Sequence, residues 1–168
     1  MKKIFLLVTT IIITQFAQAQ NITDLDLFDF WVGKWNLTWD DGEGKVGKGT
    51  NNIVRIMDGK VIQENFEALE GNFKGFKGTS MSVFSPQRQT WKQAWTDNQG
   101  GYFDFTGAID GKKRMFKTTP REKDSKTIIQ RMVFYNIKDD SLTWDWESTQ
   151  DGGKTWKLQW RINYERAK

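Results

Sequence analysis

Residues 156–165 read WKLQWRINYE, and apolar and polar side chains alternate along this stretch without a break. A period of two is typical of a half-buried β-strand, because successive side chains of a strand point to opposite faces. One face carries Trp156, Leu158, Trp160, Ile162 and Tyr164. The other face carries Lys157, Gln159, Arg161, Asn163 and Glu165. We therefore expect a strand with an apolar inner face and a polar outer face.

The same alternation recurs upstream. Apolar or amide side chains that share a face are Trp91, Gln93 and Trp95; Leu142, Trp144 and Trp146; Phe103, Phe105 and Ile109; and Ile62, Phe66 and Ala68. Turn signals separate these runs, among them Asp58-Gly59, Glu70-Gly71-Asn72, Asn98-Gln99-Gly100-Gly101, Asp110-Gly111 and Asp151-Gly152-Gly153. Such dipeptides tolerate the positive φ that tight hairpins need. The pattern indicates consecutive strands joined by hairpins.

The number and order of these segments predict the fold class. We expect an all-β protein of about ten strands, an antiparallel up-and-down β-barrel with a short helical turn within residues 25–32. A two-sheet sandwich is the alternative. An even meander favours the barrel, since closing the sheet removes its exposed edges. The longest polar connection runs from Thr119 to Lys126.

The first nineteen residues have the pattern of a signal peptide. Lys2 and Lys3 precede an apolar stretch at residues 4–16, and Ala17-Gln18-Ala19 is a small-residue cleavage signal. We expect cleavage there, leaving residues 20–168 as a single barrel domain exported to the periplasm or secreted. A membrane anchor is the rival interpretation, but the stretch is shorter than the roughly 20 residues that span a bilayer. We therefore expect no stable membrane anchor after cleavage.

The composition excludes several kinds of chemistry. The 168 residues include nine Trp and twelve Phe but neither His nor Cys. Imidazole acid–base catalysis, His-ligated haem and thiolate nucleophiles are therefore excluded, and we expect no cofactor and no metal site. Without the two lysines of the leader, the 25 basic residues become 23 against 21 acidic ones. A net charge near +2 is too weak to indicate a nucleic-acid partner.

The triplet Gly33-Lys34-Trp35 follows an aromatic turn and begins the first expected strand. It resembles the G-x-W motif of lipocalins, in which the Trp closes one end of the barrel under an Arg from near the C-terminus. The resemblance implies that role for Trp35, with Arg161 or Arg166 above it. Further blocks at residues 47–53, 57–64, 91–98 and 151–156 are similar to an uncharacterised family of bacterial lipocalin-like domains. That likeness implies a calycin-type barrel and carries no established activity or substrate.

Residues 149–156, TQDGGKTW, resemble a single Asp-box, the hairpin repeated in sialidases. A sialidase propeller needs several four-stranded blades, and this motif occurs once. We interpret it as a hairpin in which the carboxylate of Asp151 accepts backbone N–H bonds and Trp156 anchors the turn.

The candidate binding residues are the side chains expected to face the barrel interior. Asp145 and Glu147 are expected to point to solvent, because they oppose the face of Trp144 and Trp146. Glu64 shares the face of Ile62 and Phe66, and either binds a ligand or is a hydrogen-bonded structural residue. Gln93 either orients a ligand or satisfies a buried polar neighbour. The candidate set is Glu64, Trp91, Gln93, Trp95, Phe103, Phe105, Trp144, Trp146 and Trp160.

Three functions remain open from the sequence. The first is a barrel that binds a small apolar or amphipathic molecule, because ligand cavities are lined mainly by apolar side chains with few polar groups. The second is a filled barrel that acts as a structural or protein-binding module. The third is a carboxylate-dependent isomerase or hydrolase centred on Glu64 and Gln93. We expect no catalytic residue of the usual kinds, and an enzyme is the less favoured interpretation.

Overall fold

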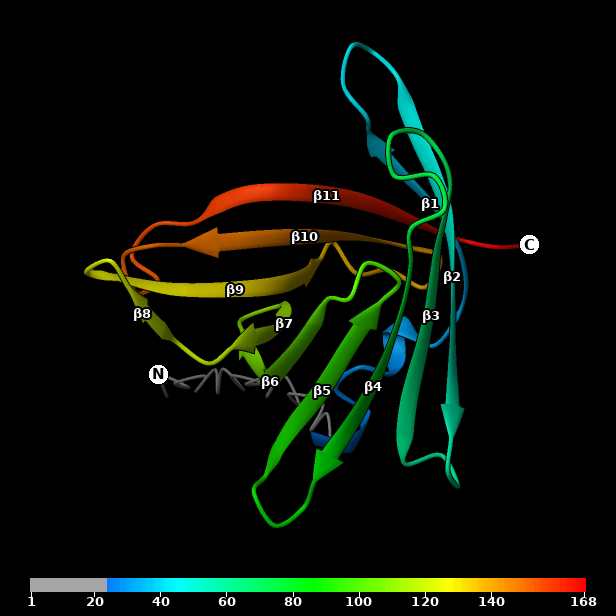
Figure 1. Ribbon diagram of the computed structural model, residues 1–168. Helices are drawn as coiled ribbons and strands as arrows, with labels where there is room; N and C mark the ends of the chain where they lie inside the picture. Colours follow the sequence, from blue (N-terminus) through cyan, green and yellow to red (C-terminus); the bar gives the residue numbers. More distant parts are fainter. Residues whose placement is uncertain (1–23) are drawn as a thin grey trace, which may run out of the picture.

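A computed structural model describes residues 24–168 as one curved antiparallel sheet (Figure 1). The expected signal peptide lies outside the described residues. The strands are β1 (Gly33–Asp40), β2 (Val46–Ile56), β3 (Val61–Glu70), β4 (Lys77–Ser85), β5 (Thr90–Asp97), β6 (Tyr102–Asp110), β7 (Lys113–Thr118), β8 (Arg121–Lys123), β9 (Lys126–Tyr135), β10 (Ser141–Thr149) and β11 (Lys157–Arg166). Two short 3-10 turns, η1 (Asp24–Asp26) and η2 (Asp29–Trp31), precede them. No helix within the described residues is long and apolar enough to cross a bilayer.

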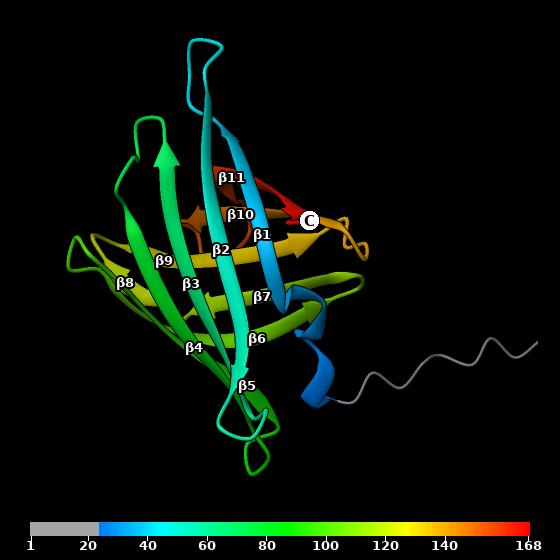
Figure 2. The ribbon, with the colours of Figure 1, turned by 90° about the vertical axis from the view of Figure 1, so that its right-hand side faces the viewer.

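The sheet closes on itself. Neighbouring strands follow the order β10-β11-β1-β2-β3-β4-β5-β6-β7-β9, and β9 also pairs with β10. Ten strands therefore form a closed up-and-down barrel, which confirms the expected fold class over the sandwich. Figure 2 shows the barrel from the side, with the 3-10 turns at one end and the β1–β2 hairpin rising from the other.

The eleventh strand lies in a segment expected to be a polar connection. β8 pairs with the start of β9 from Arg121↔Ile128 onward, whereas β7 pairs with β9 from Arg114↔Phe134 to Lys117↔Arg131. The two short strands thus follow one another along the same edge of β9. Pro120 stands between them, and proline has no N–H to continue a ladder.

The 3-10 turns close one end of the barrel with aromatic side chains. Phe28 and Trp31 are buried, and Phe28 stacks on Phe116 with ring centres 4.3 Å apart. Trp91 and Phe134 meet Phe28 edge to face. This half of the interior is therefore filled, in the manner of a packed core.

Trp35 and Arg166 complete that closed end. The guanidinium of Arg166 lies 3.9 Å from the Trp35 ring centre and donates hydrogen bonds to the carbonyls of Val32 and Phe30. Of the two arginines expected over Trp35, Arg166 is the one that the structure places there. Gly33 has φ +138°, and a Cβ at Gly33 would meet the Arg166 guanidinium at 2.0 Å. Glycine is thus required beside the arginine.

One strand departs from simple alternation. Trp146 pairs with Trp160, but Glu147 pairs with Leu158, so a β-bulge places Gln159 between them. A bulge inserts one extra residue and exchanges the faces beyond it. Leu158 consequently lies on the outer face, 42% exposed. The expectation that Leu158 shares the inner face with Trp160 is wrong for this reason.

Candidate ligand-binding cavity

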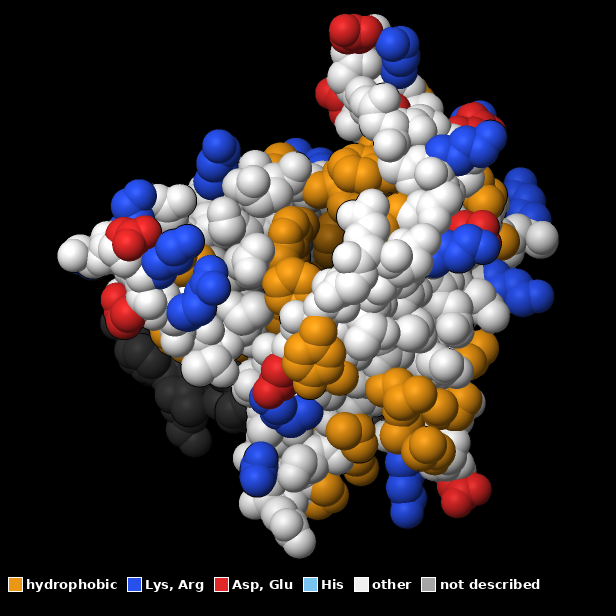
Figure 3. All heavy atoms as spheres, viewed as in Figure 1, with side chains coloured by type: hydrophobic (Ala, Val, Ile, Leu, Met, Phe, Trp, Pro, Cys, Tyr) orange, Lys and Arg blue, Asp and Glu red, His pale blue; other side chains and the backbone are white. Residues whose placement is uncertain are grey.

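The other half of the barrel contains a cavity of about 160 Å³. Its lining comes from β3, β5, β6, β9, β10, β11 and the β3–β4 connection, at the end opposite the 3-10 turns. Figure 3 shows hydrophobic side chains gathered around a hollow in the face turned to the viewer. A dry apolar cavity of about 150 Å³ holds a molecule the size of benzene, so the space fits a single ring.

Nine of the thirteen lining residues are aromatic. They are Phe66, Phe76, Trp95, Phe103, Phe105, Trp144, Trp146, Trp160 and Tyr164. The remaining four are Glu64, Asp97, Met132 and Ile162. The lining thus holds two carboxylates and neither lysine nor arginine.

The structure brings together seven of the nine candidate residues. Glu64, Trp95, Phe103, Phe105, Trp144, Trp146 and Trp160 all line the cavity. Sequence reasoning did not include Phe66, Ile162 or Tyr164, although all three share the alternation of candidates on their own strands. Phe76, Asp97 and Met132 gave weaker signals, since Phe76 lies in a loop and Asp97 ends a strand.

Trp91 and Gln93 lie outside the lining. Trp91 is buried against Phe28 and Phe84, in the filled half of the barrel. Gln93 is buried, and its Nε2 donates to the Ser82 hydroxyl over 2.9 Å. Both side chains face inward as expected, but they are too far along β5 to reach the cavity. For Gln93 the geometry favours the structural alternative over ligand orientation.

Glu64 is the only lining carboxylate that is fully enclosed. It is 4% exposed, and Oε1 accepts a hydrogen bond from Asn51 Nδ2 over 2.7 Å. Oε2 accepts one from the Ser80 hydroxyl, also over 2.7 Å. Burial raises the pKa of Glu64 to about 7, although the bonds from Ser80 and Asn51 act in the opposite direction. Near pH 7 the protonated and ionised forms of this carboxyl group are therefore both populated.

Tyr164 shares the side chain of Asn51 with Glu64. Its hydroxyl oxygen accepts a hydrogen bond from Asn51 Nδ2 over 3.3 Å. Burial raises the pKa of Tyr164, and the nearby Glu64 charge raises it further. The phenol thus stays neutral, and among the described residues that line the inner end of the cavity Glu64 is the group that titrates near neutral pH.

Asp97 stands at the outer end and is held by its own turn. Its carboxylate accepts hydrogen bonds from the backbone N–H of Gly101, the indole N–H of Trp95 and the backbone N–H of Gln99. Partial burial raises the pKa of Asp97, but these bonds outweigh it, and the net pKa is lowered. Asp97 therefore stays ionised at neutral pH.

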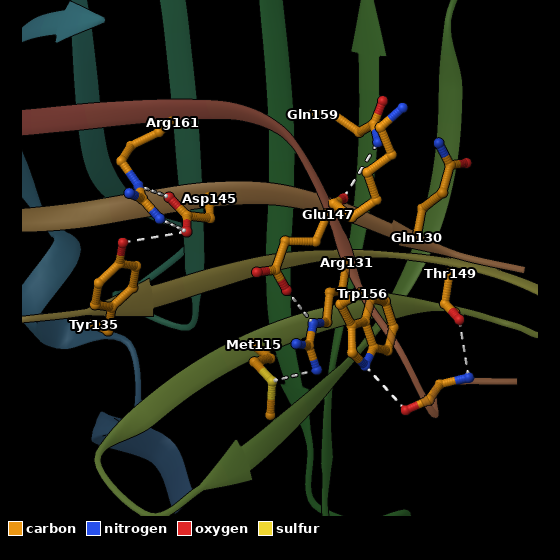
Figure 4. A network of polar contacts seen from close by, with 12 residues as sticks. Met115, Gln130, Arg131, Tyr135, Asp145, Glu147, Thr149, Trp156, Gln159 and Arg161 are labelled. Carbon is orange, nitrogen blue, oxygen red and sulfur yellow. Dashed lines mark hydrogen bonds and ion pairs between the residues drawn. The ribbon is translucent and has the colours of Figure 1, made fainter. Parts of the chain in front are cut away.

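A second set of polar contacts covers the outer face of β9, β10 and β11 (Figure 4). Arg161 binds Asp145 through two bonds of 2.8 and 2.7 Å, and the Tyr135 hydroxyl donates to Asp145 over 3.2 Å. Asp145 does lie opposite the tryptophan face, but the expectation that it points to solvent is wrong, since it is 4% exposed. A long arginine side chain on the neighbouring strand covers it.

Glu147 is covered in the same way. It accepts a bond of 2.6 Å from Arg131, whose guanidinium lies 3.6 Å from the Trp156 ring centre. Figure 4 shows this cluster beside the Asp145 group on the outside of the strands. Every cation in it is paired, so the cluster stabilises the barrel wall and offers no free charge to a ligand.

The 149–156 hairpin has the expected turn chemistry. Asp151 accepts bonds from the backbone N–H groups of Lys154 and Thr155 and from the hydroxyls of Thr149 and Thr155. The bonds from Thr149 and Thr155 hold the pKa of Asp151 well below its usual range. The Trp156 indole donates to Gly153 O over 3.1 Å. Asp151 and Trp156 thus fasten the turn.

No protein family model matches this chain, and no curated protein is significantly similar to it. The fold and the cavity define an antiparallel ten-stranded barrel, hollow at one end and closed at the other. Within residues 24–168 no group of three acidic side chains is placed to hold a metal ion.

Proposed function

We propose that the protein binds a small apolar or amphipathic molecule in the cavity of its barrel. One observation carries this proposal: nine aromatic side chains surround a space of about 160 Å³, whereas Phe28, Trp31 and Phe116 are buried against one another and their neighbours in the opposite half of the barrel. Apolar walls with a few polar groups are the usual composition of a small-molecule site. The likeness to lipocalin-like domains and the expected export agree with carriage of such a molecule outside the cytoplasm.

The alternative of a barrel filled throughout is less well supported, because the aromatic residues on β6, β10 and β11 line a space. The carboxylate-dependent enzyme remains the second candidate. It rests on Glu64, whose pKa of about 7 suits a general acid or base. The enzyme hypothesis also requires a second reacting group at a defined distance from Glu64.

Binding is tested with fluorobenzene, whose size matches the cavity, followed by 19F NMR. We expect saturable line broadening with the wild-type protein. In Ile162→Trp the larger side chain occupies the cavity and should abolish binding, since Ile162 is 2% exposed and lines it. The matched control is Leu158→Trp, which adds the same indole on the outer face of the same strand and should bind normally.

Circular dichroism establishes that both variants fold. The proposal fails if the wild-type protein gives no saturable binding, or if a folded Ile162→Trp variant binds as well as wild type. Native mass spectrometry of protein purified from its own host supplies an independent readout, because a bound molecule adds a discrete mass.

A further inference from the structure

We infer that the molecule held in this cavity is a small organic cation, an amine with an aromatic or short aliphatic group, whose ammonium lies against Glu64. This inference rests on the proposed function and adds the chemical class of the ligand. The geometry that points to it is the combination of a buried carboxylate, a wall of aromatic rings and a lining without basic groups.

The charges of the lining all have one sign. Glu64 stands at the inner end and Asp97 at the outer end, and the lining includes neither lysine nor arginine. Arg131 on β9 and Arg161 on β11 form ion pairs with Glu147 and Asp145 on the outer face of the wall. An anionic ligand would meet two carboxylates without a counter-charge, whereas a cation is attracted to both.

The aromatic rings favour the same class. Trp144 and Trp160 meet edge to face with centres 6.1 Å apart, and Trp160 meets Phe66 in the same way at 5.9 Å. The face of an aromatic ring carries partial negative charge, and several rings around a space form the cage that proteins use for ammonium groups. Aromatic rings alone would suit a hydrocarbon ligand. The buried carboxylate of Glu64 beside them is the feature that favours a cation.

Glu64 has capacity left for a ligand. An ionised carboxylate offers about four lone-pair positions, and the protein occupies one on each oxygen, through Asn51 and Ser80. An ammonium with three N–H donors supplies both the remaining hydrogen bonds and the counter-charge that this buried group lacks. The charge-assisted bonds so formed are among the stronger ones in proteins.

Binding is therefore linked to one proton. Below the pKa of Glu64, near 7, an arriving ammonium displaces the carboxyl proton to solvent. The groups that face Glu64 from neighbouring strands are Asn51 on β2, Ser80 on β4 and Tyr164 on β11, and Asp97 is the other carboxyl group of the cavity. Asp97 is ionised throughout this range and Tyr164 is neutral, so the proton belongs to Glu64.

The test uses three probes of nearly equal size: benzylamine as the cation, benzyl alcohol as the neutral isostere and benzoate as the anion. Titration calorimetry at pH 8 should show benzylamine binding at least about tenfold more tightly than benzyl alcohol, and benzoate should bind most weakly. Between pH 7 and pH 5 the benzylamine affinity should fall by about tenfold per pH unit. Buffers of different ionisation enthalpy should report the release of about one proton in that range.

Two variants locate the effect. Glu64→Gln keeps the size of the side chain and should remove the advantage of benzylamine while benzyl alcohol binds as before. Asp104→Asn, which alters an exposed carboxylate on β6 paired with Lys92, should change neither affinity. If no probe binds, the proposed function itself fails. If benzyl alcohol or benzoate binds as well as benzylamine, or Glu64→Gln keeps the preference, the cavity binds ligands but this inference is overturned.

Discussion

The guanidinium of Arg166, the last residue of β11, lies 3.9 Å from the ring centre of Trp35 at the start of β1. It also donates hydrogen bonds to the carbonyls of Phe30, Val32 and Asp139. One side chain thus joins the first strand, the last strand, the 3-10 turn and the β9–β10 connection. The closed end of the barrel depends on this contact.

Replacing Arg166 with alanine should lower the free energy of unfolding by about 2–4 kcal/mol, because the cation–π contact and the charged hydrogen bonds are lost together. Arg166→Lys retains the charge without the planar fork and should fall between wild type and alanine. Urea unfolding followed by tryptophan fluorescence measures both. An alanine variant within about 0.5 kcal/mol of wild type, which is the range of an ordinary surface substitution, would contradict the assigned role.

The sequence allowed the contact that closes this end of the barrel to be predicted, but not which arginine makes it. The G-x-W triplet and a C-terminal arginine indicated the contact, but two arginines, Arg161 and Arg166, satisfied the pattern equally. Pairing register decides between them: Trp35 lies opposite Arg166 across the β1–β11 ladder. Register follows from the closure of the whole barrel, and one strand's sequence does not specify it.

The cavity shows a similar limit. Period-two alternation correctly placed Glu64 and Gln93 on inner faces, yet only Glu64 reaches the cavity. Alternation determines the face of a strand but carries no information on depth along the barrel axis. The division into a filled and a hollow half arises from the 3-10 turns, where Phe28 and Trp31 enter from outside the sheet.

The glycine at position 78 makes room for Trp95. A Cβ there would lie 2.0 Å from Trp95 Cζ2, and the φ of Gly78 is outside the left-handed region, so the clash alone determines the cost. Gly78→Ala should therefore destabilise the protein by about 1–3 kcal/mol. In a Trp95→Leu background the same change should cost little, which a double-mutant cycle measures as coupling between the two positions. Additive effects of the two substitutions would argue against the contact.

The buried carboxylate of Asp145 on the outer face should contribute far more to the free energy of unfolding than the exposed carboxylate of Asp104. Asp145→Asn removes the negative charge and one of the two oxygens that accept hydrogen bonds from Arg161 and Tyr135, and we expect a loss of about 1–3 kcal/mol. Asp104→Asn breaks an exposed pair with Lys92 and should cost less than about 1 kcal/mol. Thermal unfolding compares them, and equal effects would show that the cover over Asp145 contributes nothing.

Substitution of Asp151 should loosen the 149–156 turn and leave the other turns unchanged. Asp151→Ala removes the acceptor for the backbone N–H groups of Lys154 and Thr155, so these two amides should exchange faster in hydrogen-exchange NMR. Asp151→Asn keeps one acceptor oxygen and should slow the exchange again in part. The amide of Gly100, bonded to the Asp97 carbonyl in another turn, is the internal reference. Unchanged protection of the Lys154 and Thr155 amides from exchange would show that the Asp151 carboxylate does not stabilise the turn.

Glu64 makes the stability of the ligand-free protein depend on pH in an unusual direction. Its folded-state pKa of about 7 exceeds the 4.5 of an unperturbed glutamate, so between these values the folded state binds more protons than the unfolded state. The stabilising contribution is complete below pH 4.5 and is lost as pH rises to about 7, which amounts to about 3 kcal/mol at 1.36 kcal/mol per pKa unit. Glu64→Gln cannot ionise and should lack this loss.

The difference in unfolding free energy between Glu64→Gln and wild type is measured in urea at intervals from pH 4.5 to pH 8. It should move in favour of the variant until about pH 7 and then stay level. Subtraction removes the other titrating groups, which both proteins share. A difference that is constant across the range would show that Glu64 is not buried as a carboxyl group with a raised pKa.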